Sequence, residues 1–141
     1  MASVQIYKDL VFMVQKIIGK NTTTEHTLTA AGKHIFGDDY EGTFAIDEVP
    51  KTPFKYAIVN VDARRSGGSH WVAVAHVDNE QYMVYDSFGR KTAKLLPTLD
   101  LQTIDTEHDA EQTSKEKNCG ARVLAWLMLF DSFGPQVAQT I

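Results

Sequence analysis

Apolar side chains recur at helical spacing along the first part of the chain. Between residues 2 and 19 they return every three or four positions, for example at Tyr7, Val11 and Val14, and polar residues fill the opposite side. This period predicts an amphipathic helix that packs on the core and ends at Gly19. A membrane-surface or partner-binding helix is the alternative, and it is disfavoured because the polar side is not strongly basic.

A second helix is predicted at about residues 25–35. Candidate N-cap residues at 21–24 precede the helical pattern, and Gly37 follows it. We interpret residues 38–50 as a loop that contains a short extended piece at 42–46.

From residue 56 the pattern changes to that of β-strands. Short apolar runs at 56–61, 71–77, 81–85 and, with weaker alternation, 99–104 predict four strands. The second and third runs are joined by a turn at 78–80, so these two strands are predicted to form an antiparallel hairpin.

Near the end of the chain, a polar run at 111–118 meets an almost wholly apolar run at 121–130. Cys119 lies at the junction, and Asn118 before it is a candidate N-cap whose side-chain oxygen accepts from a first-turn N–H. The apolar run predicts a helix that is buried on all sides, with Cys119 in its first turn. There the positive end of the helix dipole favours thiolate, the nucleophilic form, over thiol.

The order of helices, strands and a buried helix is typical of an α+β domain. We expect one domain over residues 1–141, with a mainly antiparallel sheet of about four strands and helices packed on it. In this fold the candidate nucleophile lies at the N-terminus of the buried helix. A chain of 141 residues can bury one substantial core but not two.

Composition and charge narrow the classes of function. Charged residues make up 23% of the chain and hydrophobic residues 43%, which is ordinary for a globular protein, and the net charge of −4 does not indicate nucleic-acid binding. A single cysteine excludes an intramolecular disulfide and a cysteine-rich zinc site. Together with the lack of a signal peptide, it predicts a reducing compartment and not secretion. The longest apolar run, about ten residues, is too short to cross a bilayer.

Four polar residues on this framework match the needs of a thiol hydrolase. Besides its nucleophile, such an enzyme needs a base, a group that orients the base, and donors for an oxyanion. His70 precedes the strand at 71–77 and Asp86 ends the next strand, so the hairpin is expected to bring them together. Gln112, seven residues before Cys119, has a side-chain amide suited to the oxyanion.

Each of these residues also has an ordinary interpretation, as a loop histidine, a turn-forming aspartate or a solvated glutamine. If all of these ordinary interpretations were correct, the match of the four residues to one catalytic arrangement would be a coincidence. A zinc site of His70, Asp86 and Cys119 is disfavoured, and no metal is expected, because no second His or Cys falls at helical or turn spacing. His76 has no obvious acidic partner, and His108 is a reserve base.

With these residues in view, the sequence resembles the adenovirus maturation protease (adenain) family. This family lies within the wider group of proteases that process ubiquitin-like proteins. The resemblance rests on AIVN at 57–60, GGSHW at 67–71, YDSFG at 85–89, and Gln112 followed by Cys119-Gly120. The order of histidine, tryptophan, acid, glutamine and Cys-Gly is the signature of that group.

The resemblance implies an adenain-like fold and a role for each residue. It makes Cys119 the nucleophile and His70 the base and then the acid. It makes Asp86 the group that orients His70, and Gln112 an oxyanion donor. Adenain has Glu in place of Asp86, whereas the ubiquitin-like proteases have Asp, so the role of the acid is kept.

The resemblance also implies where substrate binds. Trp71 beside the base is expected to form a narrow channel that favours substrates of Gly-x-Gly or Gly-Gly type. Gly68 and Gly42 are expected to be substrate-binding residues with it, since Gly42-Thr43-Phe44 is similar to a Gly-Thr-aromatic segment of adenain. The similar region spans about residues 22–131 and leaves the helix within residues 1–20 as an addition.

The chain departs from the family in its activators. Covalent activation by a peptide needs a second cysteine, which this chain lacks. Adenain is basic and uses DNA as a cofactor, whereas this chain is acidic, so DNA activation is not expected. The expected partners are protein substrates, and neither a cofactor nor a membrane is expected. The charge of the chain does not indicate nucleic acid as a partner, but a local basic patch at Arg64, Arg65 and Arg90 leaves this alternative open.

Three hypotheses follow. The favoured one is a viral cysteine endopeptidase that cleaves capsid or other virion precursors, inside the virion or the host cell. The first alternative is a protease that removes ubiquitin-like modifiers by the same chemistry. The second is a binding module that keeps the fold without activity.

Overall fold

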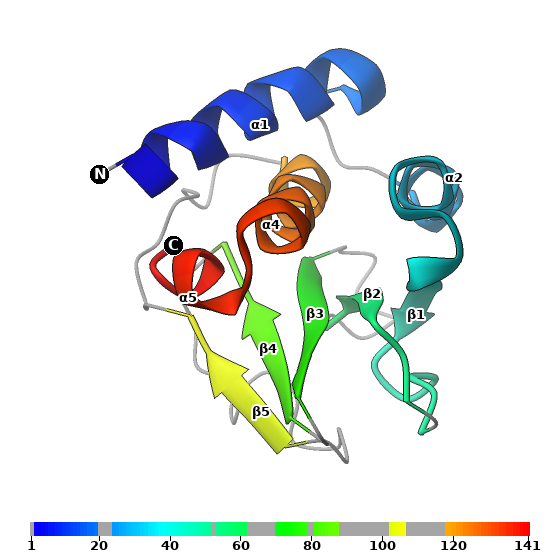
Figure 1. Cartoon of the computed structure of the whole chain (residues 1–141). Helices are drawn as coiled ribbons and strands as arrows, with labels where there is room; N and C mark the ends of the chain where they lie inside the picture. Colours follow the sequence, from blue (N-terminus) through cyan, green and yellow to red (C-terminus); the bar gives the residue numbers. More distant parts are fainter. Residues whose placement is uncertain are drawn as a thin grey trace.

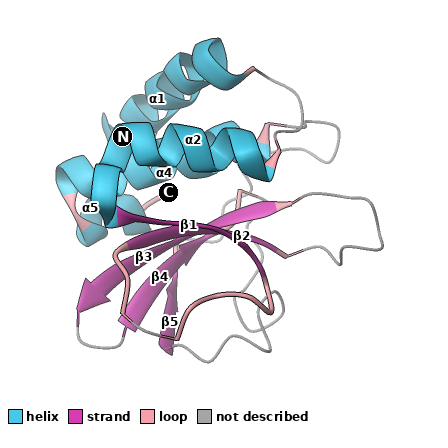
Figure 2. Cartoon of the chain, turned by 90° about the vertical axis from the view of Figure 1, so that its right-hand side faces the viewer, coloured by secondary structure: helices cyan, strands magenta, loops and turns pink. Residues whose placement is uncertain are grey.

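The computed structural model describes residues 2–19, 24–51, 53–61, 70–78, 81–87, 102–106 and 118–141. Its elements in chain order are α1 (Ala2–Ile18), α2 (Glu25–Phe36), the 3-10 turn η1 (Gly37–Asp39), β1 (Tyr40–Ala45), β2 (Tyr56–Asn60), β3 (Trp71–Asp78), β4 (Gln81–Tyr85), β5 (Gln102–Asp105), α4 (Cys119–Phe133) and α5 (Pro135–Gln139). The helices lie on one side of the sheet (Figures 1 and 2). This is the α+β arrangement that the sequence predicts.

The sheet has five strands in the order β1-β2-β3-β4-β5. The two central pairings, β2 with β3 and β3 with β4, are antiparallel, which confirms the predicted hairpin. The two outer pairings, β1 with β2 and β4 with β5, are parallel. The sheet therefore has one strand more than the four or so predicted, and the prediction of antiparallel pairing holds for its two central pairings but not for its two outer ones.

The additional strand is β1, which the sequence pattern presented as a loop with a short extended piece. Its pairing with β2 shifts register between Tyr40 and Gly42. This irregularity interrupts the alternation that marks a strand in sequence. Where no short turn joins two strands, residue patterns do not determine the strand direction, which depends on how the connecting segment crosses the sheet.

The central strands alternate between two apolar layers. On β2, Tyr56 and Ile58 belong to the core beneath the helices, whereas Ala57 and Val59 belong to a smaller cluster on the other face. The smaller cluster includes Phe54. Both faces of the central strands are buried, and this explains why they read as continuous apolar runs.

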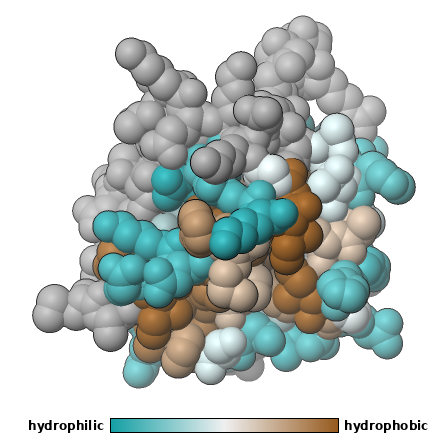
Figure 3. Space-filling view, turned by 90° about the horizontal axis from the view of Figure 1, so that it is seen from above, coloured by the Kyte–Doolittle hydropathy of each residue, from teal (hydrophilic) through white to brown (hydrophobic). Residues whose placement is uncertain are grey.

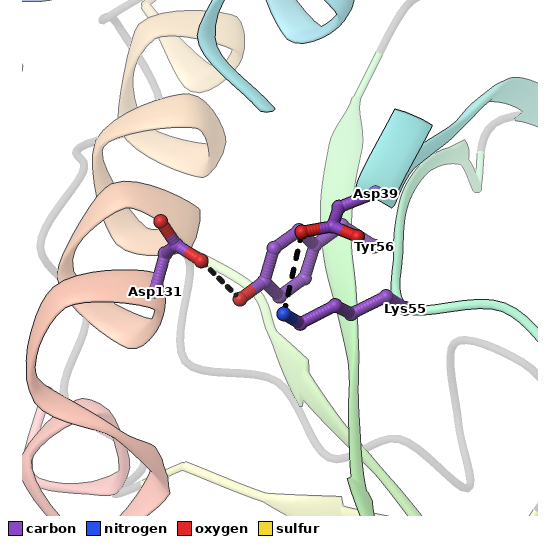
Figure 4. Close-up of polar contacts among 4 residues, drawn as sticks. All are labelled: Asp39, Lys55, Tyr56 and Asp131. Carbon is purple, nitrogen blue, oxygen red and sulfur yellow. Dashed lines mark hydrogen bonds and ion pairs between the residues drawn. The ribbon is translucent and has the colours of Figure 1, made fainter. Parts of the chain in front are cut away.

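Among the described helices, α4 is the most deeply buried. Trp126 is fully buried, stacks on Tyr85 of β4 at a centroid distance of 5.5 Å, and donates from its indole Nε1 to the Ala138 carbonyl at 3.0 Å. At the far end of the helix, Asp131 accepts a hydrogen bond of 2.7 Å from the Tyr56 hydroxyl, as Figure 4 shows. These contacts fix α4 on the sheet along its length.

Helix α1 packs across α4, as its period predicts (Figure 1). Its buried side includes Tyr7, Val11 and Val14, and Gly19 ends it at a positive φ of 92°. The outer side exposes Phe12 and other large apolar residues, and apolar patches are visible among polar ones on the helical face (Figure 3). No described helix is both long and apolar enough to span a membrane.

Helix α2 contacts β1 through a glycine. A Cβ built at Gly32 lies 2.5 Å from a ring carbon of Tyr40, which is fully buried and whose hydroxyl bonds Thr43 at 2.5 Å. We therefore expect Gly32→Ala to lower the free energy of unfolding by about 1–3 kcal/mol through overpacking. Urea denaturation measures this change.

The matched control is Ala30→Gly at an exposed position of the same helix. It measures the intrinsic preference of α2 for alanine over glycine, about 1 kcal/mol in favour of alanine. A Gly32→Ala variant that gains the full helical preference measured at position 30 would show that the Tyr40 ring moves aside without cost.

Candidate active site

His70 lies immediately before β3 and is buried, with 5% of its surface exposed. Its carbonyl accepts a hydrogen bond of 3.0 Å from the Val61 N–H, so the β2–β3 ladder holds its backbone. The imidazole is thus fixed at the end of the sheet where β3 begins.

Asp86 follows β4 directly and is 3% exposed. Because β3 and β4 are antiparallel, the start of one strand lies beside the end of the other. His70 Nε2 and Asp86 Oδ1 are 2.5 Å apart, which confirms the predicted proximity of the two side chains. The carboxylate fixes the ring orientation and leaves Nδ1 as the ring nitrogen for a second partner.

That second partner is Cys119, whose side chain forms a hydrogen bond with His70. Cys119 is the first residue of α4 and is 3% exposed. It reaches the histidine because α4 packs on β3. A thiol, an imidazole and a carboxylate therefore form one hydrogen-bonded chain, built from three separate parts of the sequence.

The protonation of His70 reflects this position. Burial by itself lowers the pKa of the imidazole because the cation loses solvation. The hydrogen bonds with Asp86 and Cys119 act in the opposite direction and prevail, so the pKa of His70 lies above its ordinary value of 6.5. The site thereby favours the imidazolium, the form that can give a proton to a leaving group.

The N-terminus of α4 differs from the prediction in one detail. Asn118 is the N-cap residue, but its side chain makes no capping bond to a first-turn N–H. Instead, its Oδ1 accepts a hydrogen bond of 3.2 Å from Arg122 Nε. Two features of the sequence could have indicated this pair. Asn118 and Arg122 are one helical turn apart, and Arg122 is the one charged residue within the apolar run.

The other predicted site residues divide into two groups. Gln112 and Gly68 lie outside the described residues, as does the reserve base His108. Trp71 is described, and its side chain is 4% exposed and belongs to the core beneath the helices. Its role in a substrate channel stays a prediction.

Gly42 has a local structural reason to be glycine. Its φ is 155°, and an added Cβ would lie 2.9 Å from the Phe44 ring. It pairs with Ala57 on β2, and β2 separates it from β3 and His70. The arrangement of β1 thus explains the residue without a substrate, and its predicted substrate contact stays untested.

Within the described ranges, no group of three His, Cys, Asp or Glu side chains is arranged to hold a metal ion. His76 contacts the ring of Tyr82 at a centroid distance of 5.1 Å, near the end of β3 that is far from His70.

Comparison with known families agrees with the geometry. The sequence profile of the adenovirus endoprotease family matches residues 47–119, slightly more than half of the chain. The match includes His70, Asp86 and Cys119, and it is shorter than the resemblance over 22–131. No curated protein matches the chain.

Proposed function

Since the chain belongs to the adenovirus endoprotease family and is a cysteine protease, we propose that it cleaves capsid or other virion precursor proteins after small residues such as glycine. The observation that carries this proposal is the contact of His70 with both Asp86 and Cys119. In a chain that had kept the fold without the activity, nothing would maintain this buried chain of polar groups.

In the first half of the proposed reaction, the Cys119 thiolate attacks the carbonyl carbon of the scissile peptide bond. The resulting oxyanion accepts hydrogen bonds from the Cys119 backbone N–H and from the side-chain amide of Gln112. The first N–H groups of a helix have no acceptor within the helix, so the start of α4 is suited to this task. The His70 imidazolium gives its proton to the leaving amine, which departs and leaves a thioester on Cys119.

In the second half, His70 is neutral and acts as a base. It takes a proton from water, whose oxygen attacks the thioester carbonyl. The tetrahedral intermediate collapses, releases the carboxylic acid, and restores the thiolate and imidazolium. Asp86 stays ionised throughout and keeps the imidazole in one orientation.

Specificity in this proposal follows from the resemblance, which implies a narrow channel beside Trp71 that admits small substrate side chains. Neither a cofactor nor an activating DNA is part of the proposal, and both the virion and the host-cell interior suit a catalytic free thiol.

The proposal predicts cleavage of a diverse peptide library, read by mass spectrometry. We expect cuts after glycine and other small residues, because a narrow channel excludes larger side chains. The same library treated with the Cys119→Ala variant supplies the background. Cuts that persist in this variant, or that follow bulky residues without preference, would contradict the proposal.

A ubiquitin-like fusion protein separates the two protease hypotheses. The virion-precursor hypothesis predicts that short Gly-x-Gly peptides are cleaved at least as well as the fusion. Cleavage of the fusion alone would select removal of ubiquitin-like modifiers, since that activity depends on recognition of a folded modifier. An absence of all cuts, also with added DNA and virion-derived peptides, would favour the inactive binding module.

A further inference from the structure

Helix α1 sends one polar group into the core next to the active site. Tyr7 is 1% exposed, and its hydroxyl forms a hydrogen bond with the hydroxyl of Tyr85, which is fully buried. The two rings also meet edge to face, with centroids 5.9 Å apart. Tyr85 is the last residue of β4, and Asp86 follows it directly.

The same hydroxyl contacts the helix that carries the nucleophile. The Arg122 guanidinium donates to the Tyr7 hydroxyl oxygen at 3.3 Å and, through Nε, to Asn118 Oδ1 at 3.2 Å. Asn118 precedes Cys119 directly, and its carbonyl accepts the first helical hydrogen bond, from the Arg122 N–H at 3.1 Å. Arg122 therefore joins the start of α4 to Tyr7.

These bonds form one continuous chain of contacts from α4 to β4. Because Arg122 donates to the Tyr7 oxygen, the hydroxyl proton of Tyr7 is available for Tyr85. One end of the chain is the residue before Cys119, and the other is the residue before Asp86. Tyr7 is the member that connects them, and it comes from a helix outside the residues that match the family.

From this geometry we propose that Tyr7 is a positioning residue for the active site. Through its hydroxyl it holds the start of α4 at a fixed distance from the end of β4. It thereby sets the spacing of the Cys119 thiol from the pair of His70 and Asp86. The inference rests on the proposed catalytic role of these three residues.

The physical basis is the small tolerance of nucleophilic catalysis to displacement. A thiolate and an imidazole must keep hydrogen-bond distance, and a shift of about 1 Å by a remote change can cost on the order of 10²-fold in rate. Packing alone permits small slides of one helix on another, whereas a buried directional hydrogen bond restricts them. Tyr7 supplies such a bond at the contact of α1, α4 and β4.

The test is Tyr7→Phe, which removes the hydroxyl and keeps the ring in the core. The matched control is Tyr56→Phe, which removes another hydroxyl that bonds to α4, at Asp131 and far from Cys119 in that helix. Tyr7→Phe removes the hydrogen bonds with Tyr85 and Arg122, whereas Tyr56→Phe removes the one with Asp131. Thermal unfolding is therefore expected to show a loss of stability in both variants, and the larger loss in Tyr7→Phe. The two variants differ in position, because the hydroxyl of Tyr7 lies next to the active site and that of Tyr56 does not.

We expect Tyr7→Phe to lower kcat for peptide cleavage about tenfold. KM is expected to stay constant, because Tyr7 is buried and does not touch the substrate. Tyr56→Phe is expected to leave both constants unchanged. Equal kcat values for the two variants would overturn the proposal, as would a loss confined to KM.

A second readout needs no substrate. The rate at which iodoacetamide alkylates Cys119 at neutral pH reports the pairing of the thiolate with His70, and we expect Tyr7→Phe alone to slow it about threefold or more. If the wild type cleaves no peptide but this difference is present, the protease proposal fails and the positioning role stands. If wild type and both variants react at one rate, the positioning role fails, whatever the peptide assay shows.

Discussion

Replacing Cys119 with alanine is expected to abolish peptide cleavage, with a fall in kcat on the order of 10⁶-fold. The reason is that the Cys119 side chain contacts His70, the proposed base, and that the chain has no second cysteine to form the thioester. The fold is expected to persist, because alanine removes a single buried sulfur atom and introduces no charge or strain. Peptide cleavage and thermal unfolding, measured on the same preparation, check both statements.

Met13→Ala is the control for this variant. Met13 lies on the outer side of α1 and is 54% exposed, so its loss is expected to leave cleavage unchanged. Appreciable proteolysis by the purified Cys119→Ala protein would remove Cys119 from the mechanism.

Asp86→Asn is expected to lower kcat by about 10²–10⁴-fold while leaving the structure in place. The amide keeps the shape of the side chain but loses the charge that stabilises the imidazolium and raises the pKa of His70. The alkaline limb of the pH profile, where His70 loses its proton, is therefore expected to move to lower pH. A variant whose alkaline limb coincides with that of the wild type would contradict this role of Asp86.

The same substitution makes a prediction for stability. The pKa of His70 is higher in the folded state than its ordinary value, so the folded state binds the proton more tightly. The resulting stabilisation is complete below pH 6.5 and is lost as the pH rises through the folded pKa. Asp86→Asn is thus expected to destabilise the protein more at pH 5.5 than at pH 9, as denaturant titrations at the two pH values would show.

Asp131→Asn provides the comparison for both measurements. It removes a carboxylate that also accepts a hydrogen bond, from Tyr56, but at the end of α4 that is distant from Cys119. It is expected to alter neither the alkaline limb nor kcat. A similar loss in both variants would indicate a general effect of charge.

The proximity of His70 and Asp86 could be predicted because it depends on local information alone. Two strands and the short connection between them determine which residues face each other, and these patterns are visible in the sequence. The burial of α4 was predictable for the same reason, since an apolar run of that length has no polar side to expose. Both features follow from short segments without knowledge of the tertiary fold.

The features that the sequence did not predict depend on contacts between distant segments. The parallel pairing of β1 depends on the path of the connection to β2, and apolar periodicity does not report this path. The bond between Tyr7 and Tyr85 joins residues 78 positions apart, and Tyr7 fits a simple core position in the helical pattern equally well. Propensity suggested a capping bond for Asn118, whereas the side chain of Arg122, one turn away, competes for the same oxygen.

The place of Cys119 in the chain has a consequence for protein synthesis. The helix that carries it, α4, leaves the ribosome after the strands that hold His70 and Asp86 and long after α1. Because α1 and the sheet both bury their apolar sides against α4, the core stays open until that helix emerges. A nascent chain therefore has neither its nucleophile nor a closed core until α4 has emerged, and before that point it cannot cleave proteins near the ribosome.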